Sequence, residues 1–265
     1  MYGTHAAPGR DGWTYGIGLE EKVPRMPAER LRSLSAFFPA HDEEDNVVPM
    51  AEAVLAVLPD VAAEWELVIV DDGSRDATGA RADALAASRD RVRVVHHPVN
   101  RGYGAAIRSG LGAARHEWIF YTDGDRQFDP RQVTRLIAEL PHADVVVGWR
   151  ARRADHALRR LNTFAWNTLI RVLFGLDVRD VDCAFKLFPR RALDGLVLEA
   201  EGAMISTELL AHFRRRGLRI VEVPVDHLPR TSGSPSGNDP RVILRAFREL
   251  ARLYPRIRAV SRPAR

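Results

Sequence analysis

The sequence contains one cysteine, Cys183, and only two lysines, Lys22 and Lys186, among its 39 basic side chains. A single cysteine excludes an internal disulfide and a cysteine-rich zinc cluster. The other cations are all arginine, which we interpret as a coding preference, so arginine clusters alone do not indicate a nucleic-acid site. Aromatic residues interleaved with basic ones, as in single-strand binders, are also missing. We therefore expect no nucleic-acid partner, although a net charge of +4 allows attraction to phosphates or anionic lipid.

Long hydrophobic runs are absent as well. No stretch approaches the roughly 18 to 20 continuous apolar residues of a membrane-spanning helix, and the first residues, MYGTHAAPGRDGWTYG, lack the apolar core of a signal peptide. We therefore expect a cytoplasmic protein. Residues 1–32 are rich in glycine, proline and charge without periodicity, which predicts a flexible leader.

From Ser33 onward, short apolar runs alternate with segments of helical spacing. The predicted strands are SLSAFF, ELVIV, VRVV, EWIFY and ADVVVG. This alternation is typical of an α/β fold with a Rossmann-like, mostly parallel sheet flanked by helices, and we assign residues 33–236 to that domain. Ligands of such sheets lie beyond the carboxyl ends of the strands, so the residues after each strand form the candidate site.

Acidic residues follow three of the predicted strands, in PAHDEED, DDGSRD and TDGDRQ. Three acidic clusters at one edge repel one another unless some hold a cation and others accept hydrogen bonds from a sugar or base. Asp72 is placed for the second task, whereas Asp76 is equally well explained as a helix cap. His96 and His97, at the end of the third strand, are predicted to be surface residues.

Asp123 and Asp125 carry the strongest signal, because they end a buried apolar strand with two carboxylates one residue apart. Mg²⁺ and Mn²⁺ prefer oxygen ligands, and a metal held by one or two carboxylates keeps positions for substrate phosphates. Gln127 repeats the spacing of two and could add a third oxygen. The alternative is an acidic turn without a metal. We predict a Mg²⁺ or Mn²⁺ site formed by Asp123, Asp125 and Gln127.

The glycine-rich segment NRGYGAAIRSG opens a predicted helix. A dinucleotide fingerprint should instead follow the first strand, where PAHDEE contains no glycine. A dinucleotide-dependent oxidoreductase is therefore disfavoured. Gly102 and Gly104 are expected to permit a close approach of the backbone to a nucleotide or to a neighbouring strand.

Together these segments resemble family 2 of the nucleotide-sugar-dependent glycosyltransferases, which have the GT-A fold, and within it the dolichyl- and polyprenyl-phosphate mannose synthase-like branch. The resemblance spans about Ser35 to Ser234 and rests on the ordered motifs PAHDEE, DDGSRD, NRGYGAA, DGDRQFDP, GWR, RDVDCAFKLFPRRAL and VEVPVDHLPRTSGS. It implies a metal-dependent, inverting enzyme that moves a hexose from a GDP- or UDP-linked sugar to a polyprenyl phosphate. Two alternatives stay open: a hydroxyl acceptor on a sugar, glycolipid or cell-wall polysaccharide, and a membrane-surface nucleotide-sugar-binding module without turnover.

The resemblance also implies roles for individual residues. The implied donor-binding residues are Pro39, Ala40, Asp42, Glu43, Asp72, Gly102, Asp123, Gly124 and Asp125. The implied contacts of the acceptor phosphate are Arg150, Lys186, Arg230 and Ser234. The catalytic set is Asp125, Arg150, Asp182, Lys186 and Glu208. Asp182 and Glu208 are the candidate bases for a hydroxyl acceptor, and a purely structural role is equally plausible for each.

Residues 237–265 are predicted to form a basic amphipathic helix and tail. One row of the helix is basic, with Arg241, Arg245, Arg248, Arg252 and Arg256, and the row offset by two residues is apolar, with Ile243, Phe247, Leu250, Tyr254 and Ile257. Pro255 is expected to end or bend this helix. Together with the apolar stretch from Leu158 to Leu176, the helix either packs on the sheet or lies peripherally on the anionic inner face of a membrane.

Overall fold

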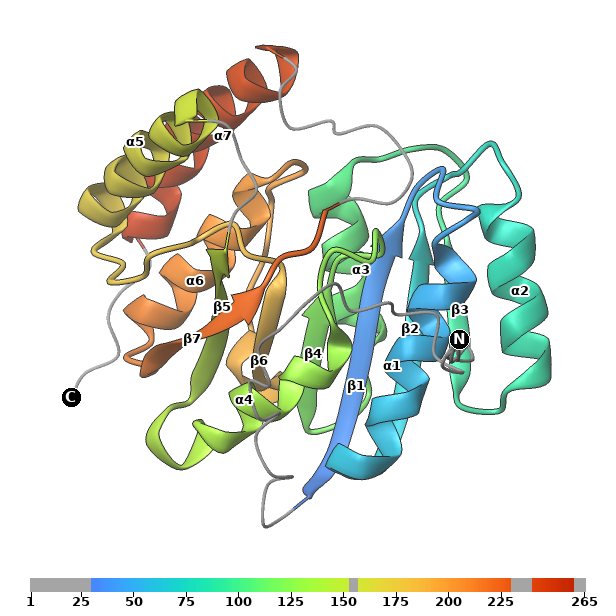
Figure 1. Ribbon diagram of the computed structural model, residues 1–265. Coiled ribbons are helices and arrows are strands. Elements are labelled where there is room, and N and C mark those ends of the chain that lie inside the picture. The colour runs from blue at the N-terminus through green and yellow to red at the C-terminus, as the bar shows by residue number, and fades with distance from the viewer. Residues whose placement is uncertain (1–29, 153–156, 230–239, 260–265) are drawn as a thin grey trace, which may run out of the picture.

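In the computed structural model, residues 30–152, 157–229 and 240–259 are described, and they contain one seven-stranded sheet with helices on both faces (Figure 1). The strands are β1 (Leu31–Ala40), β2 (Ala62–Asp71), β3 (Val92–His96), β4 (Trp118–Thr122), β5 (Val145–Arg152), β6 (Phe185–Pro189) and β7 (Ile220–Asp226). Their order is β3-β2-β1-β4-β6-β5-β7. Within the described residues, β6 is the one strand that runs antiparallel to its neighbours. The predicted α/β fold with a mostly parallel sheet is confirmed.

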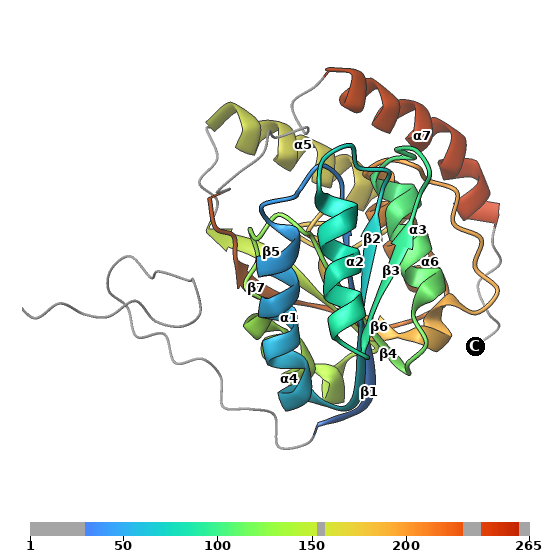
Figure 2. The ribbon, with the colours of Figure 1, turned by 90° about the vertical axis from the view of Figure 1, so that its right-hand side faces the viewer.

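The helices cover the two faces of the sheet unequally. Helices α1 (Val47–Val61), α2 (Thr78–Ser88) and α4 (Val133–Ala138) lie on one face, and α3 (Tyr103–Ala113) and α6 (Met204–Arg215) lie on the other (Figure 2). Short 3-10 turns occupy Pro130–Gln132, Leu140–His142 and Arg190–Leu193. The remaining two helices, α5 (Ala157–Phe174) and α7 (Pro240–Ala259), run side by side beyond the carboxyl ends of the strands, and α7 packs on α6.

The central strands are buried on both faces, as expected for strands covered by helices on each side. Aromatic rings fill much of this core: Phe37 of β1 stacks on Tyr121 of β4 with ring centroids 5.3 Å apart, and Phe120 meets Phe185 of β6 edge to face at 4.8 Å. Each such ring buries a large apolar area, and the offset and edge-to-face geometries are the favoured ones. The interlocked rings hold β1, β4 and β6 in register, which fixes the positions of the residues at their ends.

Two strand boundaries differ from the sequence-based expectation. Strand β1 begins at Leu31, within the last two residues of the predicted leader. Trp149 and Arg150 lie inside β5 and not after it, because β5 continues to pair with β7 as far as Arg152 and Asp226. Residues 1–29 and 260–265, most of the predicted leader and tail, lie outside the described part of the chain, so the predicted domain boundaries stay predictions.

Helix α7 continues past Pro255 to Ala259, so it does not end at the proline, and the predicted bend there stays a prediction. Leu253 and Ile257, on either side of the proline, are buried, and their packing holds both parts of the helix. Within the predicted apolar row, Leu250 and Ile257 are buried, whereas 49% of Phe247 is exposed. The helix packs on α6 and α5 and not on the sheet.

Helices α5 and α7 contact each other through aromatic rings. Trp166 meets Phe247 at a centroid distance of 5.4 Å, and Phe174 meets Tyr254 at 5.6 Å. Among the helices of the described residues, none combines the length and the apolar character that crossing a membrane requires. Helices α5 and α7 together form an added layer next to the strand ends that carry the acidic motifs.

The contact between α3 and β1 can be tested with two glycines of the same helix. A Cβ at Gly110 would lie 2.2 Å from the Phe37 ring, whereas a Cβ at Gly112 would meet no atom within 4 Å. We expect Gly110→Ala to lower the free energy of unfolding by about 1–3 kcal/mol through overpacking, and Gly112→Ala to raise it by roughly 0.5–1 kcal/mol. Urea unfolding followed by circular dichroism measures both, and equal stability of the two variants would contradict the packing described.

Candidate active site

The two aspartates after β4 are held close together. Asp125 is buried and Asp123 half-buried, and the hydroxyl of Tyr103, the first residue of α3, donates to Asp123 Oδ1 at 2.9 Å. Burial and the neighbouring Asp125 carboxylate raise the pKa of Asp123 to about 7. Burial and Asp123 likewise raise the pKa of Tyr103. Crowding of this kind favours a shared proton or a bound cation over two bare negative charges.

The oxygen atoms of this aspartate pair suit a hard divalent cation that keeps other coordination positions open. Asp123 and Asp125 offer carboxylate oxygens, the ligands that Mg²⁺ and Mn²⁺ prefer. Within residues 30–152, 157–229 and 240–259, no group of three or more His, Cys, Asp or Glu side chains is arranged to hold a metal. A cation at the pair would therefore take its remaining ligands from neutral oxygens, water or a substrate.

Gln127, the predicted third ligand, ties this loop to the segment after β7. The side-chain Nε2 of Gln127 donates to the Leu228 carbonyl at 2.9 Å, and the backbone carbonyl of Gln127 accepts from the Leu228 N–H at 2.8 Å. Its backbone N–H donates to Asp125 Oδ1 at 3.1 Å. Gln127 thus orients the Asp125 carboxylate, and its contact with a metal stays a prediction.

Gly124 brings the end of β1 against the aspartates. A Cβ at this position would lie 2.5 Å from the Pro39 carbonyl oxygen, a distance that backbone atoms do not tolerate. Glycine therefore allows the loop after β4 to lie directly on Pro39. The structure thus brings two implied donor-binding residues, Pro39 and Gly124, into contact.

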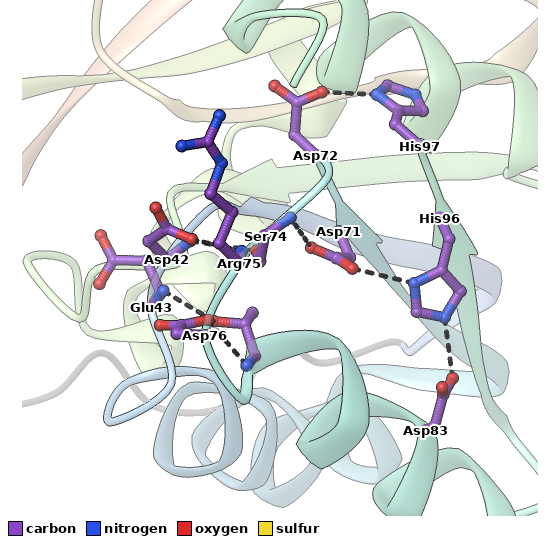
Figure 3. A network of polar contacts seen from close by, with 11 residues as sticks. Asp42, Glu43, Asp71, Asp72, Ser74, Arg75, Asp76, Asp83, His96 and His97 are labelled. Carbon is purple, nitrogen blue, oxygen red and sulfur yellow. Dashed lines mark hydrogen bonds and ion pairs between the residues drawn. The ribbon is translucent and has the colours of Figure 1, made fainter. Parts of the chain in front are cut away.

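The loops after β1 and β2 hold each other by reciprocal hydrogen bonds (Figure 3). The Asp42 N–H donates to Ser74 Oγ at 3.0 Å, and Asp42 Oδ1 accepts from the Arg75 N–H at 2.8 Å. The Glu43 N–H donates to Thr78 Oγ1 at 2.8 Å. Asp76 accepts from the Glu44 and Thr78 backbone N–H groups, which agrees with a capping role. These hydrogen bonds give the loops after β1 and β2, which contain the implied sugar-donor-binding residues, a defined shape before any ligand binds.

Asp72 is buried beneath the loop that leads into α3. Its Oδ1 accepts from the Arg101 N–H at 2.9 Å, its Oδ2 accepts from the Gly102 N–H at 2.8 Å, and His97 Nδ1 lies 2.6 Å from Oδ1 (Figure 3). Asp72 therefore positions the backbone just before Tyr103. A direct contact with a nucleoside stays a prediction.

The two histidines after β3 have different environments. His96 is exposed, as predicted, and lies between Asp71 and Asp83. The prediction is wrong for His97, which is 5% exposed and bridges Asp72 and Ser109. His97 is buried because it lies on the Asp72 carboxylate, and a buried charge needs hydrogen-bond donors. The sequence around Val95–Pro98 could not predict this burial, since the partner lies 25 residues away.

The two predicted phosphate-binding cations hold the loop before β6. Arg150 donates from Nε and Nη2 to the two oxygens of Asp180, at 2.7 Å each. Lys186 is fully buried, and its Nζ donates to the carbonyls of Val181, at 3.2 Å, and Cys183. Both cations nevertheless lie close enough to Asp123 to offset part of the rise in its pKa. Their contact with a phosphate stays a prediction.

The candidate bases have different surroundings. Glu208 of α6 is buried, and its oxygens accept from the backbone N–H groups of Glu199, at 2.9 and 3.0 Å, and Ala200, at 2.8 Å. This geometry agrees with the structural role considered for it. Asp182 is half-buried in the loop held by Lys186. Cys183 is buried, and burial raises the pKa of its thiol to about 12, which does not suit a nucleophile.

Sequence reasoning missed Tyr103, whose hydroxyl reaches Asp123. The only signal was an aromatic residue at the start of the glycine-rich helix segment, and its partner lies 20 residues away. Arg230 and Ser234 lie outside the described residues.

Comparisons with known proteins agree with this architecture. The sequence is 35% identical over 166 residues to dodecaprenyl-phosphate galacturonate synthase of Rhizobium johnstonii, covering 61% of this chain and 49% of that protein. It is 33% identical to glycosyltransferase AglD of Haloferax volcanii, over 79% of this chain and 35% of that protein. It is 29% identical to undecaprenyl-phosphate 4-deoxy-4-formamido-L-arabinose transferase of Pseudomonas fluorescens, over 80% and 62%. The chain thus spans between about a third and less than two thirds of the length of these relatives.

Solved structures show the same fold at lower identity. Glucosyl-3-phosphoglycerate synthase from Mycobacterium tuberculosis, in complex with Mn²⁺, UDP-glucose and phosphoglyceric acid, superposes with a TM-score of 0.66 at 22% identity, covering 92% of this chain and 86% of that one. The same enzyme with Mn²⁺ and UDP-glucose superposes with a TM-score of 0.65 at 23% identity, covering 85% and 79%. The fold is therefore the GT-A fold. The family model described as glycosyl transferase family 2 matches residues 35–197, more than half of the chain, and this protein accordingly belongs to glycosyl transferase family 2.

Proposed function

We propose that the chain is a metal-dependent, inverting glycosyltransferase that moves a hexose from a GDP- or UDP-linked sugar to a polyprenyl phosphate. The observation that carries the proposal is the Asp123–Asp125 pair, which is crowded enough to raise the pKa of Asp123 to about 7. Asp123 and Asp125 would hold Mg²⁺ or Mn²⁺, which would relieve this crowding and would leave positions for the oxygens of a diphosphate. The names of the relatives, which include dodecaprenyl- and undecaprenyl-phosphate enzymes, support the lipid acceptor.

In the proposed reaction an acceptor oxygen forms a bond to the anomeric carbon while the bond from that carbon to the diphosphate breaks. Attack opposite the leaving group inverts the centre. Asp123 and Asp125 hold the metal, which when bound neutralises charge that develops on the departing diphosphate. Tyr103 donates to Asp123 Oδ1 and so restrains this carboxylate. The loops at Asp42, Glu43 and Gly102 enclose the nucleoside.

A lipid phosphate as acceptor fits the environment of Glu208. A monophosphate is already anionic near pH 7, since its second pKa is about 6, so it needs cations more than a base. Glu208 is occupied by the backbone of residues 199 and 200. Arg150 and Lys186, together with Arg230 and Ser234 outside the described residues, are the proposed phosphate contacts. A hydroxyl acceptor would require a base, for which Asp182 is the candidate.

The outer surface of α5 and α7 suits contact with the cytoplasmic face of an anionic membrane. Its apolar side chains are unusually exposed, by 77% for Val172, 51% for Leu244 and 49% for Phe247. Arg248 of α7, four residues after Leu244, is exposed as well. Apolar residues next to arginines are typical of helices that lie in the interface of a bilayer. Such contact would bring the strand ends to the head group of a lipid acceptor.

Donor binding is tested with Asp125→Asn, which removes a charge and keeps the shape. We expect UDP-glucose or GDP-mannose with Mn²⁺ to raise the melting temperature of the unsubstituted protein, because ligand at 100 times Kd adds about 2.7 kcal/mol. Asp125→Asn should lose the Mn²⁺-dependent part of the shift. Asp177→Asn, at an aspartate whose side chain is 99% exposed, is the control. An unchanged shift in Asp125→Asn would show that the metal site is misassigned.

The acceptor is tested by transfer of labelled sugar to undecaprenyl phosphate in detergent or to a soluble glycan. We expect label in the lipid fraction, with a rate that changes little between about pH 7 and 8.5, because the phosphate is already ionised there. Label found only in the glycan, with a rate rising as a base ionises, would favour the hydroxyl acceptor.

Membrane contact is tested with the double substitution Leu244→Ser and Phe247→Ser. We expect about a tenfold loss of binding to phosphatidylglycerol vesicles in sedimentation, because two half-exposed apolar side chains no longer enter the bilayer. Val197→Ser, at a residue 76% exposed outside α5 and α7, should bind like the unsubstituted protein. Equal binding by the double variant would exclude this surface as the contact.

A further inference from the structure

The segment Glu199–Gly202 is a meeting point of three helices. Glu208 of α6 accepts from the backbone N–H groups of Glu199 and Ala200. Arg108 of α3 donates to the Ala200 carbonyl. The second half of the segment is held from α7, by a side chain that the reaction described above does not use.

That side chain is Glu249. Its Oε1 accepts from the backbone N–H groups of Glu201, at 3.2 Å, and Gly202, at 3.1 Å, and its Oε2 lies 3.3 Å from the Gly202 nitrogen. Hydrogen bonds to a carboxylate are stronger than those between neutral groups. The nearby ion pairs from α7 to Glu199 are exposed and contribute less. Glu249 is therefore the side chain through which α7 binds the backbone of Glu201 and Gly202.

The segment in turn fixes the first turn of α3. The Gly104 N–H donates to the Glu201 carbonyl at 2.8 Å. A Cβ at Gly104 would lie 2.5 Å from the Ala200 carbonyl oxygen, so the two backbones touch without space for a side chain. The residue before Gly104 is Tyr103, whose hydroxyl reaches Asp123 at 2.9 Å. A continuous path of contacts thus joins Glu249 to the carboxylate pair.

We propose that Glu249 is a positioning residue for the donor site: by holding Glu199–Gly202 against α3, it keeps Tyr103 on Asp123. The inference rests on the proposed function only in taking Asp123 as part of the donor site. Glu249 lies beyond residues 35–197, which the family model matches, and it belongs to the same helix as the exposed Leu244 and Phe247. Displacement of α7 would therefore reach the carboxylate pair through the Glu249 contacts with Glu201 and Gly202.

The structural part of this proposal is tested by amide hydrogen exchange. Glu249→Ala removes both acceptor oxygens, and Glu249→Gln keeps one. We expect exchange in peptides covering residues 199–206 and 101–106 to become about 3- to 30-fold faster in Glu249→Ala and less so in Glu249→Gln. Glu52→Gln, at an exposed glutamate of α1 paired with Arg89, is the matched control and should leave these peptides unchanged. Unchanged exchange at residues 101–106 in Glu249→Ala would overturn the proposal.

The functional part is tested by calorimetric titration of UDP-glucose and GDP-mannose in the presence of Mn²⁺. For whichever sugar binds the unsubstituted protein, we expect affinity to fall about 3- to 10-fold in Glu249→Ala and to recover partly in Glu249→Gln. A role in stability alone would lower the melting temperature and leave the affinity of the folded protein unchanged, which overturns the inference. Failure of the unsubstituted protein to bind either sugar would count against the proposed function, while the exchange measurement still decides on Glu249.

Discussion

The crowding of Asp123 and Asp125 at the end of β4 is the constraint on which the rest of the site depends. Two carboxylates in partly buried surroundings repel each other, and the protein only partly offsets this, with the Tyr103 hydroxyl and the more distant charges of Arg150 and Lys186. Two carboxylates with this raised pKa are suited to the hard divalent cations that prefer oxygen ligands.

Most of the polar side chains near this pair are engaged in shaping the loops around it. Asp72, Glu208 and Lys186 are buried, and each one bonds to backbone groups of a segment that borders the site. Burial of a charge is costly unless it is hydrogen-bonded, so such residues take the backbone as their partner. The result is an edge of the sheet whose loops are held in shape by buried polar side chains.

The C-terminal helix belongs to this arrangement although it lies outside the part of the chain that the family model matches. Leu250, Leu253 and Ile257 bury one side of α7, while Phe247, three residues before Leu250, remains half-exposed. The helix is thus bound to the domain along part of its length and exposed along the rest. Such a helix can pack on the protein with one side and contact a lipid surface with another. Packing and membrane contact, the two alternatives that its sequence left open, are therefore compatible.

The α/β class, five of the seven strands, the acidic motifs at their ends and the resemblance to the family could be predicted from the sequence, because apolar periodicity and short motifs are local properties; β6 and β7 were not predicted. Only the tertiary structure decided that His97 is buried on Asp72, that Tyr103 reaches Asp123 and that Lys186 supports a loop. These pairings depend on the strand order β3-β2-β1-β4-β6-β5-β7, in which β6 enters between β4 and β5. Residues distant in the chain meet only after that order is set, and no local pattern specifies it.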